Sequence, residues 1–220
     1  KDLPEIIGVF DPGKTIISMT TNSSVLRDGY LEKLRNAGLS CLHFSLNSPD
    51  PVVNDRQRDH VGHYDLVMQK IDEAVALDYE ICLSIVVAKN NLADVRKLVR
   101  LTKQKGIGVV FSLATPSGNW TGATDELLDM DDWGGIDALM DSTPHIRSDW
   151  TINLDMKKGC PAGYEKIAIS PYGDVQGCAM LFVSHGNVRK EPLVDVVERM
   201  REWSHYKKRA GKCLIALDRP

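Results

Sequence analysis

Strand-like and helix-like segments alternate through the first half of the chain. Apolar and β-branched runs at 15–21, 41–46, 80–88 and 107–114 are typical of strands, and apolar residues between them recur at helical spacing. Strands separated by helices in this way pair in parallel through right-handed crossovers. The sequence therefore predicts an α/β fold. Four strands are too few for a closed barrel, so either the sheet is open or part of the domain is missing.

The pattern changes after the fourth strand. An acidic, weakly amphipathic helix is expected over 125–142, and 145–158 has the composition of a linker. Beyond the linker, the sequence predicts a β-hairpin over 166–179 and then one amphipathic helix. These changes divide the chain into two predicted domains, an α/β domain over 1–150 and a small α+β domain with cysteines over 151–220.

Charge and hydropathy exclude two classes of partner. The 27 basic and 30 acidic residues give a net charge of −3, which provides no electrostatic reason to bind nucleic acid or an anionic membrane. Apolar runs such as 85–88 are far shorter than the roughly 20 residues that span a bilayer. No leader-like segment is visible at Lys1. We therefore expect a cytoplasmic protein that has neither nucleic acid nor a membrane as its partner.

The five cysteines fall into two groups. Cys41 and Cys82 lie in expected strands and are predicted to be buried structural thiols. Cys160, Cys178 and Cys213 lie in turn-rich or helix-flanking surroundings, and the hairpin between Cys160 and Cys178 could bring their sulfurs together. Soft thiolates of this kind hold iron–sulfur clusters. Zinc is the competing metal, although the close CxxC pair typical of zinc sites is absent, and three unrelated thiols remain an alternative.

Polar side chains gather where the expected strands end. In a parallel sheet, ligands bind beyond the carboxyl ends of the strands, where hydroxyls and amides can hold ribose oxygens or a carboxylate. The residues at these ends are Thr20, Thr21, Asn22, Ser45, Asn47, Ser84, Lys89, Ser112 and Thr115. The alternative is that such residues cap the helices that follow.

One arginine and two histidines lie after the second strand. Arg58 is predicted to lie in a loop, where its planar fork could bind a carboxylate or could be a solvated charge. His60 and His63 are also expected in a loop, and they are given no role.

Together, these segments resemble the radical S-adenosylmethionine (radical SAM) superfamily, in the branch with a C-terminal SPASM or twitch domain. Residues 18–22 are similar to the third barrel strand of that family, 43–50 to its fourth strand and 54–58 to its HDxxR segment. The surroundings of the cysteines, 159–163 and 170–178, look like an auxiliary-cluster domain.

The family's CxxxCxxC loop and GGE segment are not present in the chain. Residues 1–7 look like the helix that follows the GGE segment. The resemblance therefore implies a partial (β/α) barrel of the radical SAM type, similar to a TIM barrel, with about four βα units here and the first two missing. Without the ligands of the radical-generating cluster, the chain alone is expected to be inactive.

The resemblance also implies an activity, namely that of a radical SAM oxidoreductase. A reduced [4Fe–4S] cluster on the missing part would cleave S-adenosylmethionine to a 5′-deoxyadenosyl radical, which abstracts a hydrogen atom from a peptide or small-metabolite substrate. The electron donor would be a flavodoxin or ferredoxin.

Site residues follow from the same resemblance. Ser45 and Arg58 would contact the cofactor, Thr20 and Asn22 would line the same pocket, and Ser84 is a weaker candidate. The cluster ligands would be Cys160, Cys178 and Cys213, which would hold an auxiliary [4Fe–4S] cluster. Its fourth ligand would lie beyond Pro220, or one iron would be open to substrate.

Two other functions fit the residues. The chain could be a non-catalytic iron–sulfur or zinc-binding interaction module on an incomplete α/β scaffold, and the residues encoded upstream of Lys1 decide this. It could also be an ordinary α/β-barrel enzyme with structural zinc, in which case metal analysis would find zinc without iron or sulfide.

Overall fold

The computed structural model describes residues 2–114, 124–148 and 159–207. The chain divides into two compact units, Lys1–Asp149 and Trp150–Pro220. Among the described helices, none is both long and apolar enough to cross a membrane.

The first unit contains a parallel sheet of five strands in the order β1-β2-β3-β4-β5. The strands are β1 (Ser18–Thr21), β2 (Cys41–Ser45), β3 (Glu80–Val87), β4 (Gly108–Leu113) and β5 (Ile146–Ser148). The four predicted strands are present, but β5 begins inside the segment predicted to be a linker. This strand was missed because its three residues, with an exposed arginine in the middle, form no apolar run.

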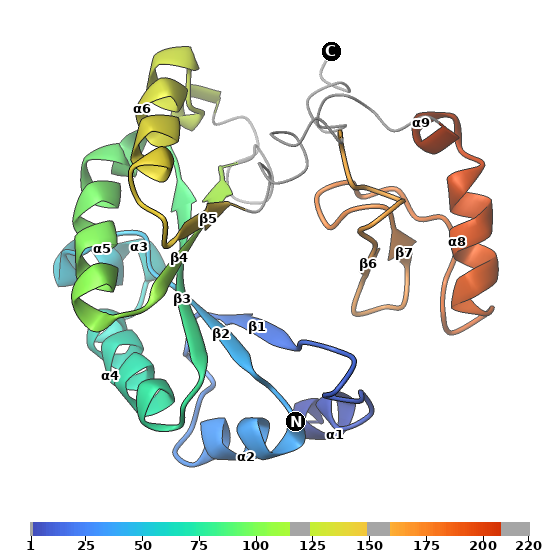
Figure 1. Cartoon of the computed structure of the whole chain (residues 1–220), viewed down its shortest axis with the longest axis horizontal. Coiled ribbons are helices and arrows are strands. Elements are labelled where there is room, and N and C mark those ends of the chain that lie inside the picture. The colour runs from blue at the N-terminus through green and yellow to red at the C-terminus, as the bar shows by residue number, and fades with distance from the viewer. Residues whose placement is uncertain (1, 115–123, 149–158, 208–220) are drawn as a thin grey trace. The chain divides into compact units, whose positions relative to one another are not determined.

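Helices follow the strands in the predicted alternation. They are α1 (Leu3–Ile7), α2 (Tyr30–Ala37), α3 (Pro51–Arg58), α4 (His63–Ala76), α5 (Leu92–Lys105) and α6 (Met130–Asp141), with short 3₁₀ turns at Lys89–Asn91 and Thr124–Glu126. In Figure 1, α4 and α5 lie along one face of the sheet, where they contact β2, β3 and β4.

Burial alternates along the strands. Side chains that point toward the helices are almost fully buried, among them Leu42, Phe44, Leu83, Ile85, Val109 and Phe111. The intervening positions, which include His43, Ser45, Cys82 and Ser84, are only half-buried. A parallel sheet covered on both faces would instead carry continuous apolar strands. Among the described helices, α4 and α5 therefore pack against one face of this sheet. The other face carries the half-buried positions and is called the open face below; a barrel wall whose inner face lines a site has this pattern.

The segment after β2 is helical, where the sequence predicted a loop. The Asp50 carboxylate accepts hydrogen bonds from the backbone N–H of Val52 (2.8 Å) and Val53 (3.1 Å), so it caps the start of α3. Arg58 is the last residue of α3, and His63 is the first of α4. The helix α3 was missed because its apolar residues lie only in the first turn, which leaves no helical periodicity.

The second unit is built around a small hairpin. The strands β6 (Ala168–Ile169) and β7 (Val175–Gln176) are antiparallel, as predicted, although shorter. They are followed by α8 (Leu193–Arg201), which contacts β7, and by α9 (Ser204–Lys207) (Figure 1). The core of this unit consists of Cys160, Ala162, Leu181, Met200 and Tyr206, with Cys178, Val197 and Trp203 packed against it.

Candidate cofactor and metal sites

Three predicted cofactor residues share the open face of the sheet, opposite the face that the described helices α4 and α5 contact. Thr20 on β1 pairs with His43 on β2, and Ser45 on β2 pairs with Ser84 on β3. Because His43 and Ser45 are two residues apart, all these side chains point to the same face. Within the described part of the chain, the hydroxyls of Thr20, Ser45 and Ser84 make no hydrogen bond. These hydroxyls are therefore available to a ligand as donors and acceptors.

Other strand-end residues serve the fold. The Thr21 hydroxyl accepts a hydrogen bond from Ser23 N (3.0 Å), and the Asn47 side-chain oxygen accepts one from Val86 N (3.0 Å). Lys89 Nζ lies 2.8 Å from Asp129 Oδ2 at the start of α6. These three side chains therefore have partners within the protein, although none of these contacts is a helix cap of the predicted kind.

Asn22 is held in place by a buried histidine. The Asn22 carbonyl accepts a hydrogen bond from His63 Nε2 (2.9 Å), and His63 Nδ1 lies 3.0 Å from the Asn54 side-chain nitrogen. A carbonyl can only accept, so Nε2 carries the proton, and Nδ1 is left to accept from Asn54. Burial lowers the pKa of His63, which keeps this imidazole neutral. Sequence analysis assigned His63 no role, whereas the structure shows that it joins the start of α4 to the residue after β1.

This network predicts a pH dependence of stability. Since His63 binds a proton less readily when folded than when unfolded, the free energy of unfolding should fall as pH drops below about 6.5. Burial also lowers the pKa of His43 and His185, and both add to the same trend. His63→Leu should cost about 1–3 kcal/mol at pH 7, because it leaves the Asn54 amide without an acceptor, and should weaken the pH dependence. Denaturant titrations at pH 5–8 measure both effects, and exposed His60→Leu is the control.

Arg58 is a half-buried cation. Its guanidinium makes no hydrogen bond or ion pair within the described residues. Its charge is among the causes that lower the pKa of His63, the residue that donates a hydrogen bond to the Asn22 carbonyl after β1. Burial also lowers the pKa of Arg58 itself. A charge that is partly removed from water and has no counter-ion is suited to bind an anionic ligand group.

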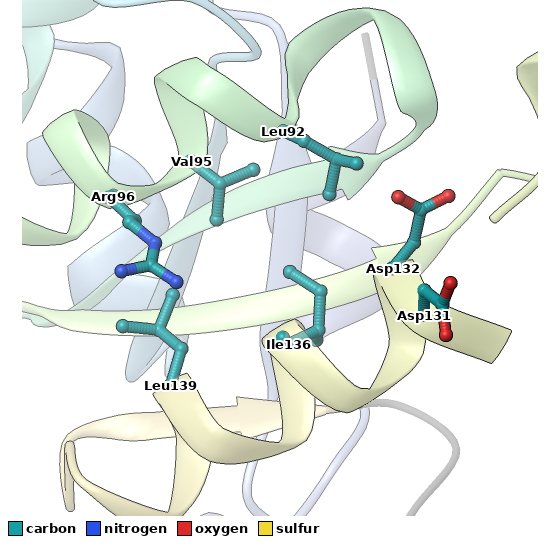
Figure 2. A pocket seen from close by; sticks show the side chains of 8 residues that line it. Leu92, Val95, Arg96, Asp131, Asp132, Ile136 and Leu139 are labelled. Atoms are coloured by element: carbon teal, nitrogen blue, oxygen red, sulfur yellow. The ribbon is translucent and has the colours of Figure 1, made fainter. Parts of the chain in front are cut away.

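A separate hollow lies between α5 and α6 (Figure 2). Its volume is about 220 Å³, and Val95 and Ile136 are its most buried lining residues. Figure 2 shows Arg96 at one end of the hollow and the carboxylates of Asp131 and Asp132 at the other. None of the predicted cofactor residues lines it.

The second unit brings two of the three predicted metal ligands into one cluster. Cys160 is buried, and Cys178 packs against the same core. The backbone N–H of Gly163 donates to the Gly177 carbonyl (3.1 Å), which ties the two cysteine-bearing segments together. Cys213 lies outside the described residues. Within the described ranges, no three His, Cys, Asp or Glu side chains are grouped closely enough to hold a metal ion, so these ranges supply only two of the predicted thiolates.

The surroundings of these thiols fit an iron–sulfur group. Tyr206 Oη and His185 Nε2 are buried and have no hydrogen-bond partner in the described part of the chain, and their rings lie 5.5 Å apart. Buried polar groups nearly always have a partner, so these atoms are suited to an additional acceptor.

Cys41 and Cys82 are not part of this group. Cys41 is buried and Cys82 half-buried, and both lie on strands of the first unit. Burial raises the pKa of both thiols, that of Cys82 to about 11. At pH 8 the thiolate of Cys82 should therefore be about 100-fold scarcer than for a thiol with the ordinary value.

Thiol labelling checks this prediction. Cys82 should react with a disulfide reagent at pH 8 far more slowly in the native protein than in denaturant. Because the folded protein holds this proton more tightly than the unfolded chain, stability should fall as pH rises above about 9. Equal reaction rates for native and denatured protein would contradict the prediction.

The fold defines a class of protein: a parallel α/β unit, followed in the chain by a small unit in which two free cysteines pack in one core cluster. Residues 3–102 match the model of the radical SAM superfamily, and residues 160–214 match SPASM, an iron–sulfur cluster-binding domain. The chain belongs to the radical SAM superfamily and carries the SPASM type of iron–sulfur domain.

Relatives agree with this assignment. The chain is 24% identical to the AdoMet-dependent heme synthase of Methanosarcina barkeri, covering 92% of this chain and 67% of that protein. For the heme synthase of Nitratidesulfovibrio vulgaris, identity is 20%, with 89% and 62% covered. The structure of Streptococcus suis SuiB bound to its precursor peptide SuiA is similar in fold, with a TM-score of 0.70 and 14% identity over 94% of this chain and 52% of that one. The chain thus spans about half to two thirds of these proteins.

Proposed function

We propose that this chain acts within an enzyme that cleaves S-adenosylmethionine reductively and abstracts a hydrogen atom from an organic substrate. The observation that supports the proposal is the set of hydroxyls on the open face of the sheet that have no hydrogen-bond partner among the described residues, together with Arg58, whose guanidinium is likewise unpaired there. These groups lie in the region that matches the superfamily model. When bound, a reduced [4Fe–4S] cluster supplies the electron that breaks the carbon–sulfur bond of the cofactor.

The residues of the chain would bind and orient the cofactor. Ser45, with Thr20 and Ser84 on the same face, can hydrogen-bond ribose hydroxyls, since a serine or threonine hydroxyl both donates and accepts. Arg58 can hold the cofactor carboxylate with two parallel hydrogen bonds. His63 fixes the backbone at Asn22 and so shapes the same edge. Such fixed positions favour one reactive geometry.

For the substrate, we propose a peptide or a small metabolite. The heme synthases support a small metabolite, and the SuiB complex with SuiA supports a peptide. In the second unit, we propose that Cys160, Cys178 and Cys213 hold an auxiliary [4Fe–4S] cluster. A flavodoxin or ferredoxin would supply the electrons.

Product analysis of the intact protein, expressed from its full reading frame, tests the proposal. After anaerobic reconstitution with iron and sulfide, and with a strong reductant, the protein should convert S-adenosylmethionine to 5′-deoxyadenosine and methionine. If fully reconstituted protein forms no 5′-deoxyadenosine, the proposed activity is wrong. The alternative, a non-catalytic metal-binding module, is then favoured.

A further inference from the structure

Tyr206 is inserted between the two segments that carry the thiols. It is only 1% exposed, although it lies on the short helix α9. A Cβ atom added to Gly163 would lie 3.0 Å from its ring, and one added to Gly177 would overlap its hydroxyl group. Both glycines therefore make room for this tyrosine, one in each cysteine-bearing segment.

The rest of Tyr206 is held by ordinary contacts. Its backbone N–H donates to the Trp203 carbonyl (2.8 Å), and its carbonyl accepts a hydrogen bond from the Tyr164 hydroxyl. Its ring packs against the rings of Trp203 and His185, at centroid distances of 5.0 and 5.5 Å. These contacts fix the ring and leave its hydroxyl beside the thiols.

The contacts of the Tyr206 ring and backbone do not account for its hydroxyl group. Tyr206 Oη is buried and has no hydrogen-bond partner among the described residues. Cys160 belongs to the same core cluster as Tyr206, and Cys178 packs against that cluster. A tyrosine hydroxyl is a hydrogen-bond donor at neutral pH. Leaving such a donor unsatisfied is costly, so a tyrosine here needs an acceptor that phenylalanine would not.

We propose that Tyr206 is a positioning residue that donates a hydrogen bond to a sulfur atom of the iron–sulfur group held at Cys160 and Cys178. This inference rests on the iron–sulfur site proposed above. Hydrogen bonds to the sulfurs stabilise their negative charge and are among the factors that set the reduction potential of a cluster. Tyr206 thereby strengthens retention of the group and raises its potential.

The Tyr206→Phe variant tests the proposal, because it keeps the ring and removes only the hydroxyl. In the intact protein without metal, the melting temperature should stay the same or rise, since a buried donor without a partner is gone. In the reconstituted protein, the auxiliary cluster should release iron to a chelator about 10-fold faster, the usual scale for loss of a group that supports a metal ligand. Its midpoint potential should shift downward, and its electron paramagnetic resonance spectrum should change.

Two controls make these results specific. Tyr172→Phe makes the same chemical change at a side chain that is 77% exposed and should leave every reading unchanged. Comparison with Cys160→Ala/Cys178→Ala identifies which spectral signal belongs to the auxiliary cluster.

Three outcomes would contradict the proposed role of Tyr206. Tyr206→Phe with wild-type potential, spectrum and iron release overturns the role of Tyr206 while leaving the proposed function intact. A lower melting temperature of the metal-free variant together with an unchanged potential assigns the hydroxyl a purely structural role. If wild-type protein holds no iron that depends on Cys160 and Cys178, the proposed cluster site and the role of Tyr206 both fail.

Discussion

Replacing Cys160 and Cys178 together with alanine is expected to remove one whole cluster from the intact protein. The reconstituted variant should lose about four iron atoms and four sulfide ions per chain, the content of one [4Fe–4S] cluster. In the proposed site, thiolates from both cysteine-bearing segments are required ligands. The hydrogen bond from Gly163 N to Gly177 O joins these two segments. Iron and acid-labile sulfide assays on wild type and variant measure the loss.

A matched control comes from the other two described cysteines. Cys41→Ala and Cys82→Ala should leave the iron and sulfide content unchanged, because both thiols lie on strands of the first unit with raised pKa values. Equal iron content in the Cys160→Ala/Cys178→Ala variant and wild type would contradict the assignment. Zinc at one equivalent, without sulfide, would favour a structural zinc site instead.

The second large effect is expected at Arg58. Arg58→Leu should weaken binding of S-adenosylmethionine to the reconstituted intact protein by about 10- to 100-fold, because a hydrogen bond to a charged group contributes about 1.5–3 kcal/mol. Arg58→Lys should recover part of the affinity, since lysine keeps the charge but not the planar fork. Anaerobic equilibrium dialysis with labelled cofactor gives the dissociation constants.

Arg56 provides the control for this measurement. It lies on the same helix, α3, and its side chain is exposed. Arg56→Leu makes the same change in net charge and should leave the affinity near that of wild type. If the two leucine variants bind the cofactor equally well, Arg58 does not hold the carboxylate.

Much of the first unit could be predicted because its strands and long helices have strong patterns. The β2 and β3 strands are apolar runs, and α4 and α5 show clear helical periodicity. The helix α3 and the strand β5 escaped because a short polar element gains its stability from tertiary neighbours, which the local sequence does not reveal.

The candidate site was harder to predict than the fold. Thr20 and Thr21 are adjacent and chemically alike, yet one residue of register places their side chains on opposite faces of the sheet. Only the structure reveals that the Thr21 hydroxyl accepts a hydrogen bond from Ser23 N, whereas the Thr20 hydroxyl has no partner among the described residues. Likewise, Asn54 and His63 are nine residues apart and meet only because α3 and α4 pack together. Nothing in the sequence marked Tyr206 as part of a site, since a tyrosine near the end of a helix usually packs against the core.

Anomalous diffraction at the iron edge, from anaerobic crystals of the intact protein with S-adenosylmethionine, tests the two proposed sites most directly. We predict iron peaks bonded to the sulfurs of Cys160 and Cys178, and cofactor density within hydrogen-bond distance of the Ser45 hydroxyl. Protein that is loaded with iron yet shows no iron at those two sulfurs, or cofactor bound away from the open face of the sheet, would contradict the proposal.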